Sequence, residues 1–351
     1  MSYFNGRKLK IEIYGSSHAE KIGVKVSGFP DFKVDFKKLA DFTERRKAKN
    51  AVYSTARKES DEPVFAGLDG ERICGDFTAE IINSDVRRND YSSLYGKPRP
   101  SHADYAWYLK DGVLDFSGGG RFSGRMTAPL CVIGGICKQF LKEKGISVEA
   151  YVSRIGKVKA KSYKTDEITL PKILSLRDKD FPSLNKKRKI LSEIEKAASS
   201  GDSLGGVIEC CVFGFPAGFG DDTFCGLEGK ISSLCFAVPA VKGVEFGSGF
   251  KGTENTGGKE NDGLYYKDGK VAFLSNNSGG INGGISNGNV ITLSVAVKPT
   301  PSVSLPQRTV DLVNKVDTEI KIIGRHDACI VPRAVPVIES VVAIALTDEL
   351  L

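Results

Sequence analysis

One stretch in the first third of the chain combines an acid-base group with groups that bind anions. His102 is one of only three histidines among 351 residues, and the acid Asp104 lies two positions after it. Histidine ionises near neutral pH, so it suits general acid-base catalysis. Three consecutive glycines, 118–120, allow backbone N–H groups to approach an anion. Arg121 and Arg125 follow and can hold a phosphate by paired hydrogen bonds. The stretch predicts an active site built around a phosphorylated molecule.

The other two histidines also lie at turns beside small or charged residues. His18 follows Gly-Ser-Ser after a strand-like run, and His326 lies in a Gly-Arg-His-Asp sequence. Each histidine alone is explained at least as well by a surface or capping role. The three together favour acid-base chemistry, because none lies on an apolar helical face.

Composition indicates a soluble globular protein, with 40% hydrophobic and 26% charged residues. The first residues lack the apolar core of a signal peptide, and no apolar run approaches the roughly 18 residues of a spanning helix. None of the eight cysteines forms a C-x-x-C pair, and most lie among apolar residues, as buried cysteines do in a reducing compartment. We therefore expect a cytoplasmic protein that contacts no membrane and binds no metal.

The formal net charge of +7 leaves two kinds of partner open. A basic nucleic-acid-binding module is one alternative, which a gel-shift assay would test. However, the basic residues are scattered among acids, and no basic run is interleaved with aromatic residues. The densest run, 186–189, is typical of a solvated helix start. A small, multiply charged anion accounts for the surplus equally well, so we expect no nucleic acid.

The hydrophobic pattern predicts a mixed α+β fold rather than a doubly wound one, because strands and helices do not alternate regularly. We expect strands at 9–14, 22–27, 64–68, 77–82, 206–213 and 290–297, a strand and then a charged loop over 147–185, and helices at 35–44, 128–144, 189–198, 223–236 and 332–351.

Four segments are expected to be irregular. Residues 47–60 are basic and polar. Residues 83–127 form a long stretch rich in Gly, Pro and Tyr. We expect this stretch to be functional rather than disordered, because of its aromatic residues. Residues 247–270 predict a mobile loop, and 275–288 a glycine-rich turn. A G-x-G-x-x-G match at 247–252 is interpreted as a coincidence, since we expect no strand-turn-helix context around it.

Several long, irregular motifs resemble those of chorismate synthase, in family order and over most of the chain. They are residues 15–30, 45–62, 99–128, 240–250, 275–302 and 324–340. The resemblance implies one large domain over 1–351, a sandwich with helices between antiparallel sheets, assembled as a homotetramer. It also implies a lyase of the shikimate pathway, which converts 5-enolpyruvylshikimate 3-phosphate to chorismate and phosphate by anti-1,4-elimination. The family requires reduced FMN, which we expect a separate reductant to supply.

The resemblance also implies roles for particular side chains. His18 resembles the general acid at the substrate's phosphate, and His102 resembles the histidine that faces the reduced flavin. Asp327 resembles the acid that helps the flavin N5 lose a proton, while Ser17 and Ser123 relay protons or bind phosphate, although each alone could be an ordinary turn serine.

Binding roles follow from motif position in the same way. The cofactor contacts implied are Arg46, Arg121, Ser123, Pro239, Ala240, Gly283, Lys298, Pro299, Thr300, Pro301, Ser302 and Arg325, and the substrate contacts are Arg46, Arg125 and Arg333. The departures from the family pattern are Ser16, Ala19, Val52, Ser101, Phe122, Met126 and Ala328. They leave one alternative open, a homologue that binds FMN or phosphate with reduced or lost elimination activity.

Overall fold

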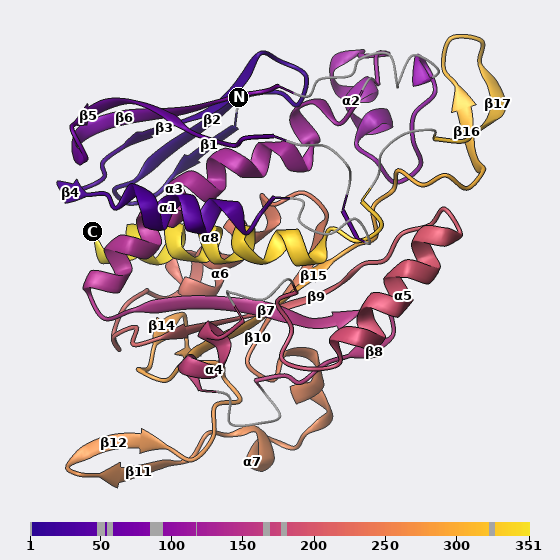
Figure 1. Ribbon diagram of the computed structural model, residues 1–351. Coiled ribbons are helices and arrows are strands. Elements are labelled where there is room, and N and C mark those ends of the chain that lie inside the picture. The colour runs from indigo at the N-terminus through magenta and orange to yellow at the C-terminus, as the bar shows by residue number, and fades with distance from the viewer. Residues whose placement is uncertain are drawn as a thin grey trace.

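Two antiparallel sheets enclose a layer of helices in the computed structural model, in which the chain ends within that middle layer (Figure 1). This confirms the expected α+β sandwich. The structure describes residues 2–47, 53–54, 59–84, 94–116, 118–163, 169–176, 181–322 and 327–351. Most of the predicted 47–60 loop, together with His326 and Arg325, lies outside these ranges.

The first sheet has six strands in the order β1-β2-β3-β6-β4, with β5 also paired to β6. They are β1 (Ser2–Asn5), β2 (Lys10–Gly15), β3 (Lys21–Ser27), β4 (Phe32–Lys33), β5 (Val64–Asp69) and β6 (Arg72–Ile82). The side chains of Ile22, Val24 and Val26 are fully buried under this sheet. The hairpin turn between β2 and β3 carries Ser17 and His18, so the sheet positions both residues at its end.

The second sheet has five strands in the order β10-β15-β9-β7-β8. They are β7 (Ser147–Ile155), β8 (Val158–Lys159), β9 (Gly206–Phe213), β10 (Val241–Phe246) and β15 (Ile291–Val297). Both Cys210 and Cys211 are buried in β9, as its apolar sequence predicts. All pairings are antiparallel, which excludes the doubly wound alternative.

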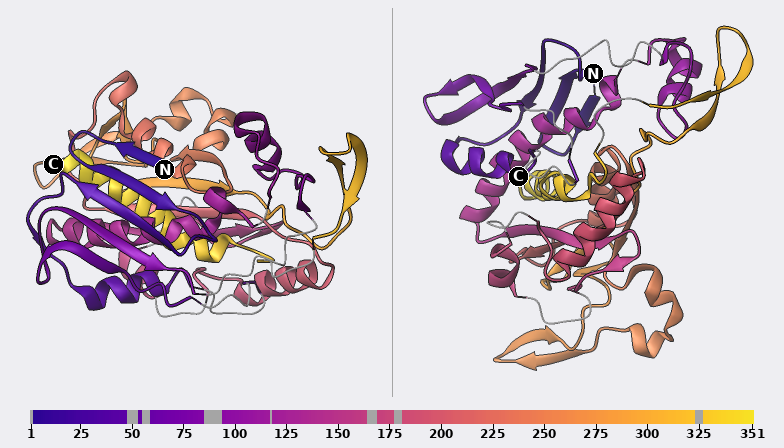
Figure 2. Two further views of the ribbon diagram at one scale, coloured as in Figure 1. Left: turned by 90° about the horizontal axis from the view of Figure 1, so that it is seen from above. Right: turned by 45° about the vertical axis from the view of Figure 1, so that its right-hand side comes forward.

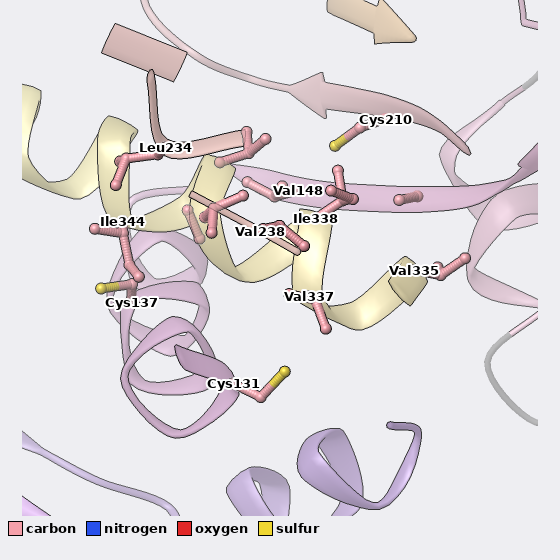
Figure 3. Close-up of a cluster of buried hydrophobic side chains, with 14 of the residues drawn as sticks. Cys131, Cys137, Val148, Cys210, Leu234, Val238, Val335, Val337, Ile338 and Ile344 are labelled. Carbon is pink, nitrogen blue, oxygen red and sulfur yellow. The ribbon is translucent and has the colours of Figure 1, made fainter. Parts of the chain in front are cut away.

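Four helices fill the space between the sheets: α1 (Phe36–Glu44), α3 (Thr127–Glu143), α6 (Leu227–Phe236) and α8 (Val331–Leu350). α8 is apolar almost all round, which is typical of a helix buried on every side. Its residues interdigitate with those of α3, β7 and α6, as in the cluster around Ile338 (Figure 3). α3 can approach α8 closely because Gly134 has no side chain: a Cβ at this position would overlap Ser340. No described helix is both long enough and apolar enough to cross a membrane.

One buried carboxylate joins this middle layer to the second sheet. Glu339 of α8 is fully buried and accepts two hydrogen bonds of 2.8 Å from Arg45, one of 2.5 Å from Lys138 and one of 3.0 Å from the N–H of Ala150. Burial alone would raise the pKa of Glu339, but the two cations outweigh it and hold that pKa below its ordinary value. The carboxylate therefore stays charged and ties α1, α3, α8 and β7 together.

The prediction that residues 83–127 form an irregular segment is wrong in part. Its described residues include helix α2 (Asp104–Asp111) and two 3₁₀ turns, η2 (Gly120–Phe122) and η3 (Gly124–Met126). Together with β16 (Gln307–Asp311) and β17 (Val316–Ile320), which were not predicted, α2 stands off to one side of the sandwich (Figure 2). A small separate core including Leu94, Phe116 and Ile320 holds this part together, so its helix lacks the broad apolar face that sequence patterns detect.

Other differences concern short elements. Residues 247–270 are not one loop, because they contain η5 (Gly249–Glu254), α7 (Gly257–Glu260) and β11 (Leu264–Lys267), which pairs with β12 (Lys270–Phe273). Their mobility stays a prediction. The remaining short elements are α4 (Leu170–Leu174), η4 (Thr223–Cys225), β13 (Ile281–Asn282) and β14 (Ile285–Ser286). The helix predicted at 189–198 is confirmed as α5 (Lys187–Ser199). A strand, β10, does precede the G-x-G-x-x-G match, contrary to expectation, but it belongs to an antiparallel sheet and leads into a 3₁₀ turn.

Candidate active site

The turn between β2 and β3 holds His18 against the triple glycine. Ser17 Oγ lies 2.8 Å from His18 Nδ1, and the N–H of Ser17 donates to the carbonyl of Gly120 at 3.1 Å. A Cβ added to Gly118 would overlap the His18 ring, so the ring lies directly against that glycine's backbone. Two segments far apart in sequence, the β2–β3 turn and the triple glycine, therefore lie in contact.

Arg125 is held in place next to this turn by Asn83, which follows β6, and by Asp61, which precedes β5. Its Nε donates to Asn83 Oδ1 at 2.8 Å, and its Nη1 pairs with Asp61. Asn83 Nδ2 in turn donates to the carbonyls of Ser16 at 3.2 Å and Ala19 at 2.7 Å. The amide of Asn83 thus links Arg125 to both ends of the His18 turn.

A second arginine shares the same acid. Arg46 Nη1 lies 3.3 Å from Asp61 Oδ2, and its Nη2 donates to the carbonyl of Arg125. Burial lowers the pKa of Arg46 from its ordinary value; the attraction of Asp61 opposes this, and the charges of Arg333 and Arg125 add to the lowering. Within the described part of the chain, Arg46 Nε and Arg125 Nη2 are buried without a hydrogen-bond partner. Buried donors of this kind are rare unless a ligand or solvent oxygen satisfies them.

Arg333, in the first turn of α8, connects this group to the expected acid Asp327. Its Nη1 donates to both oxygens of Asp327, at 2.7 and 3.0 Å, and its Nε donates to the carbonyl of Arg46 at 3.1 Å. Asp327 therefore belongs to the same cluster as Arg46 and Arg125, while part of the guanidinium expected to bind substrate is engaged with a carboxylate.

His102 lies on the other side of the triple glycine, at the start of α2. Its Nδ1 is 2.5 Å from Asp104 Oδ1. Asp104 also accepts from Arg99 Nε at 2.7 Å and Nη2 at 2.8 Å, and Arg99 Nη2 reaches the carbonyl of Gly118 at 2.6 Å. Burial alone would raise the pKa of Asp104, but hydrogen bonds from Arg99 and His102 outweigh it and lower that pKa to about 2. Gly118 is thus the common neighbour of the two histidine clusters.

The run 298–302 reaches the same region from the end of β15. Lys298 Nζ donates to the carbonyl of Ser101 at 2.5 Å, and its N–H donates to the carbonyl of Ala240 at 2.9 Å. Burial lowers the pKa of Lys298, and neighbouring Lys242 lowers it further. Thr300 Oγ1 is buried with no hydrogen-bond partner among the described residues. The run brings the Lys298 amine to the residue before His102 and carries the unsatisfied hydroxyl of Thr300 two residues further along. Pro299, Pro301 and Ser302 belong to the same run, and Pro239 precedes Ala240.

Arg121 and Ser123 follow the glycines on η2 and η3. Ser123 Oγ caps η3 by accepting from the N–H of Arg125 at 3.2 Å, so this serine also shapes the backbone. Arg121 is exposed. Phe122, which departs from the family pattern, packs edge-on against Trp107 at 5.4 Å between ring centroids. Ser101 has a φ of 59°, a conformation that favours the glycine usual in the family.

One expected residue lies far from this cluster within the chain. Gly283 lies in the β13–β14 hairpin, which is bridged to Gly220, and Gly220 donates to Glu349 at the C-terminal end of α8. Arg333 lies in the first turn of that 20-residue helix, which is about 30 Å long. Gly283 and Arg333 are therefore at opposite ends of α8.

The structure gives contacts to three side chains that the sequence did not single out as functional, Asn83, Asp61 and Arg99, and to Asp104, which the sequence marked only as an acid beside His102. Arg99 and Asp104 share a motif with His102, so the spacing alone could have suggested them. Asp61 shares the motif at 45–62 with Arg46, but no local signal links it to Arg125, which is 64 residues away. Asn83 lies in no motif, and its partner Arg125 is 42 residues away.

Comparison with known proteins identifies the family of this chain. The chorismate synthase family matches residues 9–351. Chorismate synthases from Pyrococcus abyssi and Thermococcus kodakarensis are 43% and 41% identical, each over 99% of this chain and 97% of the relative. A crystal structure of chorismate synthase aligns with a TM-score of 0.77 and 25% identity, over 99% of this chain and 92% of that one. The chain therefore belongs to the chorismate synthase family.

Proposed function

We propose that the chain converts 5-enolpyruvylshikimate 3-phosphate to chorismate and phosphate by anti-1,4-elimination, with reduced FMN as its cofactor. The observation that carries this proposal is the convergence of His18, His102, Arg125 and Asp327 on one cluster around the triple glycine. They come from three family motifs that lie far apart in the sequence, because His102 and Arg125 share the motif at 99–128.

His18 acts as the proton donor to the departing phosphate. Ser17 engages Nδ1 of the ring and the glycine backbone supports its face, so the imidazole has one fixed orientation. A general acid must be placed within hydrogen-bond reach of the atom it protonates, and such placement by a rigid turn supports this role.

Arg46 and Arg125 bind the anionic groups of the substrate. Each guanidinium is buried and keeps one N–H group without a hydrogen-bond partner in the described residues. A phosphate or carboxylate oxygen satisfies such donors and forms charge-assisted hydrogen bonds. Arg333 pairs with Asp327 and donates to the carbonyl of Arg46, which supports the proposal that the expected acid lies near the bound substrate.

The residues present fit an FMN molecule beside His102. The unsatisfied hydroxyl of Thr300 and the amine of Lys298 suit phosphate or carbonyl oxygens, and prolines 299 and 301 stiffen the turn that presents them. When bound, reduced FMN supplies electron density and accepts the hydrogen removed from the substrate. Arg121, Ser123, Arg325 and the backbone at Pro239 and Ala240 complete the set of proposed contacts.

Further features of the family are proposed for this chain. The chain forms one domain, because a single hydrophobic cluster extends through both sheets and the helices between them. It assembles as a homotetramer and works in the cytoplasm with a separate flavin reductant. Because Gly283 and Arg333 lie at opposite ends of α8, we propose that the expected flavin contact of Gly283 is made to a neighbouring copy of the chain.

An anaerobic assay tests the proposal. The purified protein is mixed with substrate and chemically reduced FMN, and chorismate and phosphate are measured. Turnover that depends on both is expected. FMN that binds without turnover would instead identify the homologue with lost elimination activity, which the departures at Ser16, Phe122 and Met126 keep as a second candidate. FMN titration with and without substrate completes the test, since a shared cluster predicts tighter FMN binding when substrate is present.

A further inference from the structure

Asp104 and Arg99 form more hydrogen bonds with each other than the capping of a helix requires. Both side chains are nearly inaccessible, with exposures of 2% for Asp104 and 4% for Arg99. The carboxylate accepts from the Arg99 backbone N–H at 3.0 Å, from its Nε and Nη2, and from His102. Three of these four hydrogen bonds come from one arginine, so the carboxylate cannot rotate.

The remaining lone pair of this fixed carboxylate points at His102. Asp104 Oδ1 lies 2.5 Å from His102 Nδ1, and an ionised carboxylate can only accept a hydrogen bond. The low pKa of Asp104, about 2, means that the group is ionised at neutral pH. Nδ1 of His102 must therefore carry a proton.

A second contact of the same nitrogen points to a different proton position. Arg99 Nη2 lies 3.2 Å from His102 Nδ1 and could donate to it only if that nitrogen were bare. A bare Nδ1 would then face the carboxylate oxygen lone pair to lone pair at 2.5 Å, which is repulsive. The shorter contact, to Asp104, therefore determines where the proton lies on His102. Arg99 Nη2 lies near Nδ1 without a hydrogen bond to it and donates to the carbonyl of Gly118 instead.

We infer that Asp104, locked by Arg99, is a positioning residue that holds His102 in one orientation and one tautomer, with the proton on Nδ1 and Nε2 left for the bound reactants. This inference rests on the proposed function, in which His102 faces the cofactor. The anionic partner also stabilises positive charge on the imidazole when Nε2 takes up a proton, as acids that orient catalytic histidines do.

The arrangement extends to the other histidine through Gly118. Arg99 Nη2 binds the carbonyl of Gly118, and the backbone of that glycine supports the His18 ring. One guanidinium thus fixes the position of Asp104 on one side and of the glycine beneath His18 on the other.

Nitrogen-15 NMR of histidine in the wild-type protein, without FMN or substrate, tests the tautomer directly. Only three histidines contribute, and the His102→Ala spectrum identifies the signals of His102. In alkaline buffer we expect a protonated Nδ1 and a bare Nε2. A bare Nδ1 with a protonated Nε2 would overturn the inference, whatever happens to catalysis.

The Asp104→Asn variant tests the consequence. The amide can donate its own N–H to Nδ1, which moves the ring proton to Nε2. We expect that change in the NMR spectrum and a decrease in kcat of about 100- to 10,000-fold, with a much smaller change in the substrate KM. The matched control is Asp111→Asn on the same helix, because Asp111 is exposed and bonds only Trp107 in the described structure. It should keep normal turnover and the wild-type tautomer.

Each result separates this inference from the proposed function. An altered tautomer with unchanged kcat would show that Asp104 sets the tautomer but would refute its role in positioning His102 for catalysis, while leaving the elimination reaction intact. A wild-type enzyme that makes no chorismate would refute the proposed function, even with Nδ1 protonated. If Asp104→Asn fails to fold, the wild-type tautomer still decides whether Asp104 orients the ring.

Discussion

The imidazole of His18 packs on the backbone of Gly118, so closely that no side chain fits between them. Gly118 also has a φ of +66°, which L-residues rarely adopt. The glycine therefore does two things: it permits the turn, and it forms the surface on which the proposed general acid rests.

Replacing Gly118 by alanine should displace the His18 ring and lower kcat by about 100-fold or more, as expected for a misplaced general acid. The measurement is anaerobic turnover with reduced FMN. Gly112→Ala is a matched control, because Gly112 has a φ of +69° but nothing within 4 Å of an added Cβ. It carries the same backbone strain without the collision, so an equal loss of kcat in both variants would assign the effect to strain.

The two histidines should be separable by function. His18→Ala should lower turnover by about 100- to 10,000-fold while leaving FMN affinity nearly unchanged. His102→Ala should alter the absorbance spectrum of reduced FMN in the complex with substrate and weaken FMN binding. Near-normal turnover in both variants would mean that both residues are structural. A changed flavin spectrum in His18→Ala alone would mean that the two roles are reversed.

Asn83 should be needed for the shape of the His18 turn. Asn83→Asp keeps an acceptor for Arg125 but loses both hydrogen bonds to the carbonyls of Ser16 and Ala19 and places a carboxylate against them. We expect a loss of about 1–3 kcal/mol in the free energy of unfolding and a lower kcat. Urea unfolding and turnover measure these effects. Asn282→Asp, at an exposed position, should change stability by less than about 0.5 kcal/mol.

Glu339→Gln should destabilise the middle layer by about 3–5 kcal/mol at neutral pH, because Arg45 and Lys138 lose their buried counter-charge. The folded protein lowers the pKa of Glu339, so its carboxylate stabilises the fold above the ordinary value of about 4.3 and ceases to do so as the pH falls below it. The difference in unfolding free energy between wild type and variant should therefore shrink in acid. Glu143→Gln, on the exposed end of α3, should show neither effect.

Regular elements with strong local patterns were predictable from the sequence. The strand at 206–213 has the predicted bounds, and the helices at 36–44 and 331–350 differ from the predictions by a residue or less at each end. The cap Asp35 and the continuous apolar run of α8 act locally, so their signals survive in the sequence. Helix α2 and the hairpins β11–β12 and β16–β17 were missed because their residues are largely exposed or bury only a small separate core.

The family and the candidate residues could be predicted as well, but how those residues come together could not. His18, His102, Arg125 and the triple glycine stand out by residue type and motif, and these motifs indicated the family from the sequence alone. Tertiary structure alone placed Asn83 on Arg125, Asp61 between Arg46 and Arg125, and Gly118 between the two histidines. These contacts depend on how the β2–β3 turn, the glycine segment and the start of α8 meet. No local pattern encodes such a meeting, because it results from the packing of two sheets on a shared layer of helices.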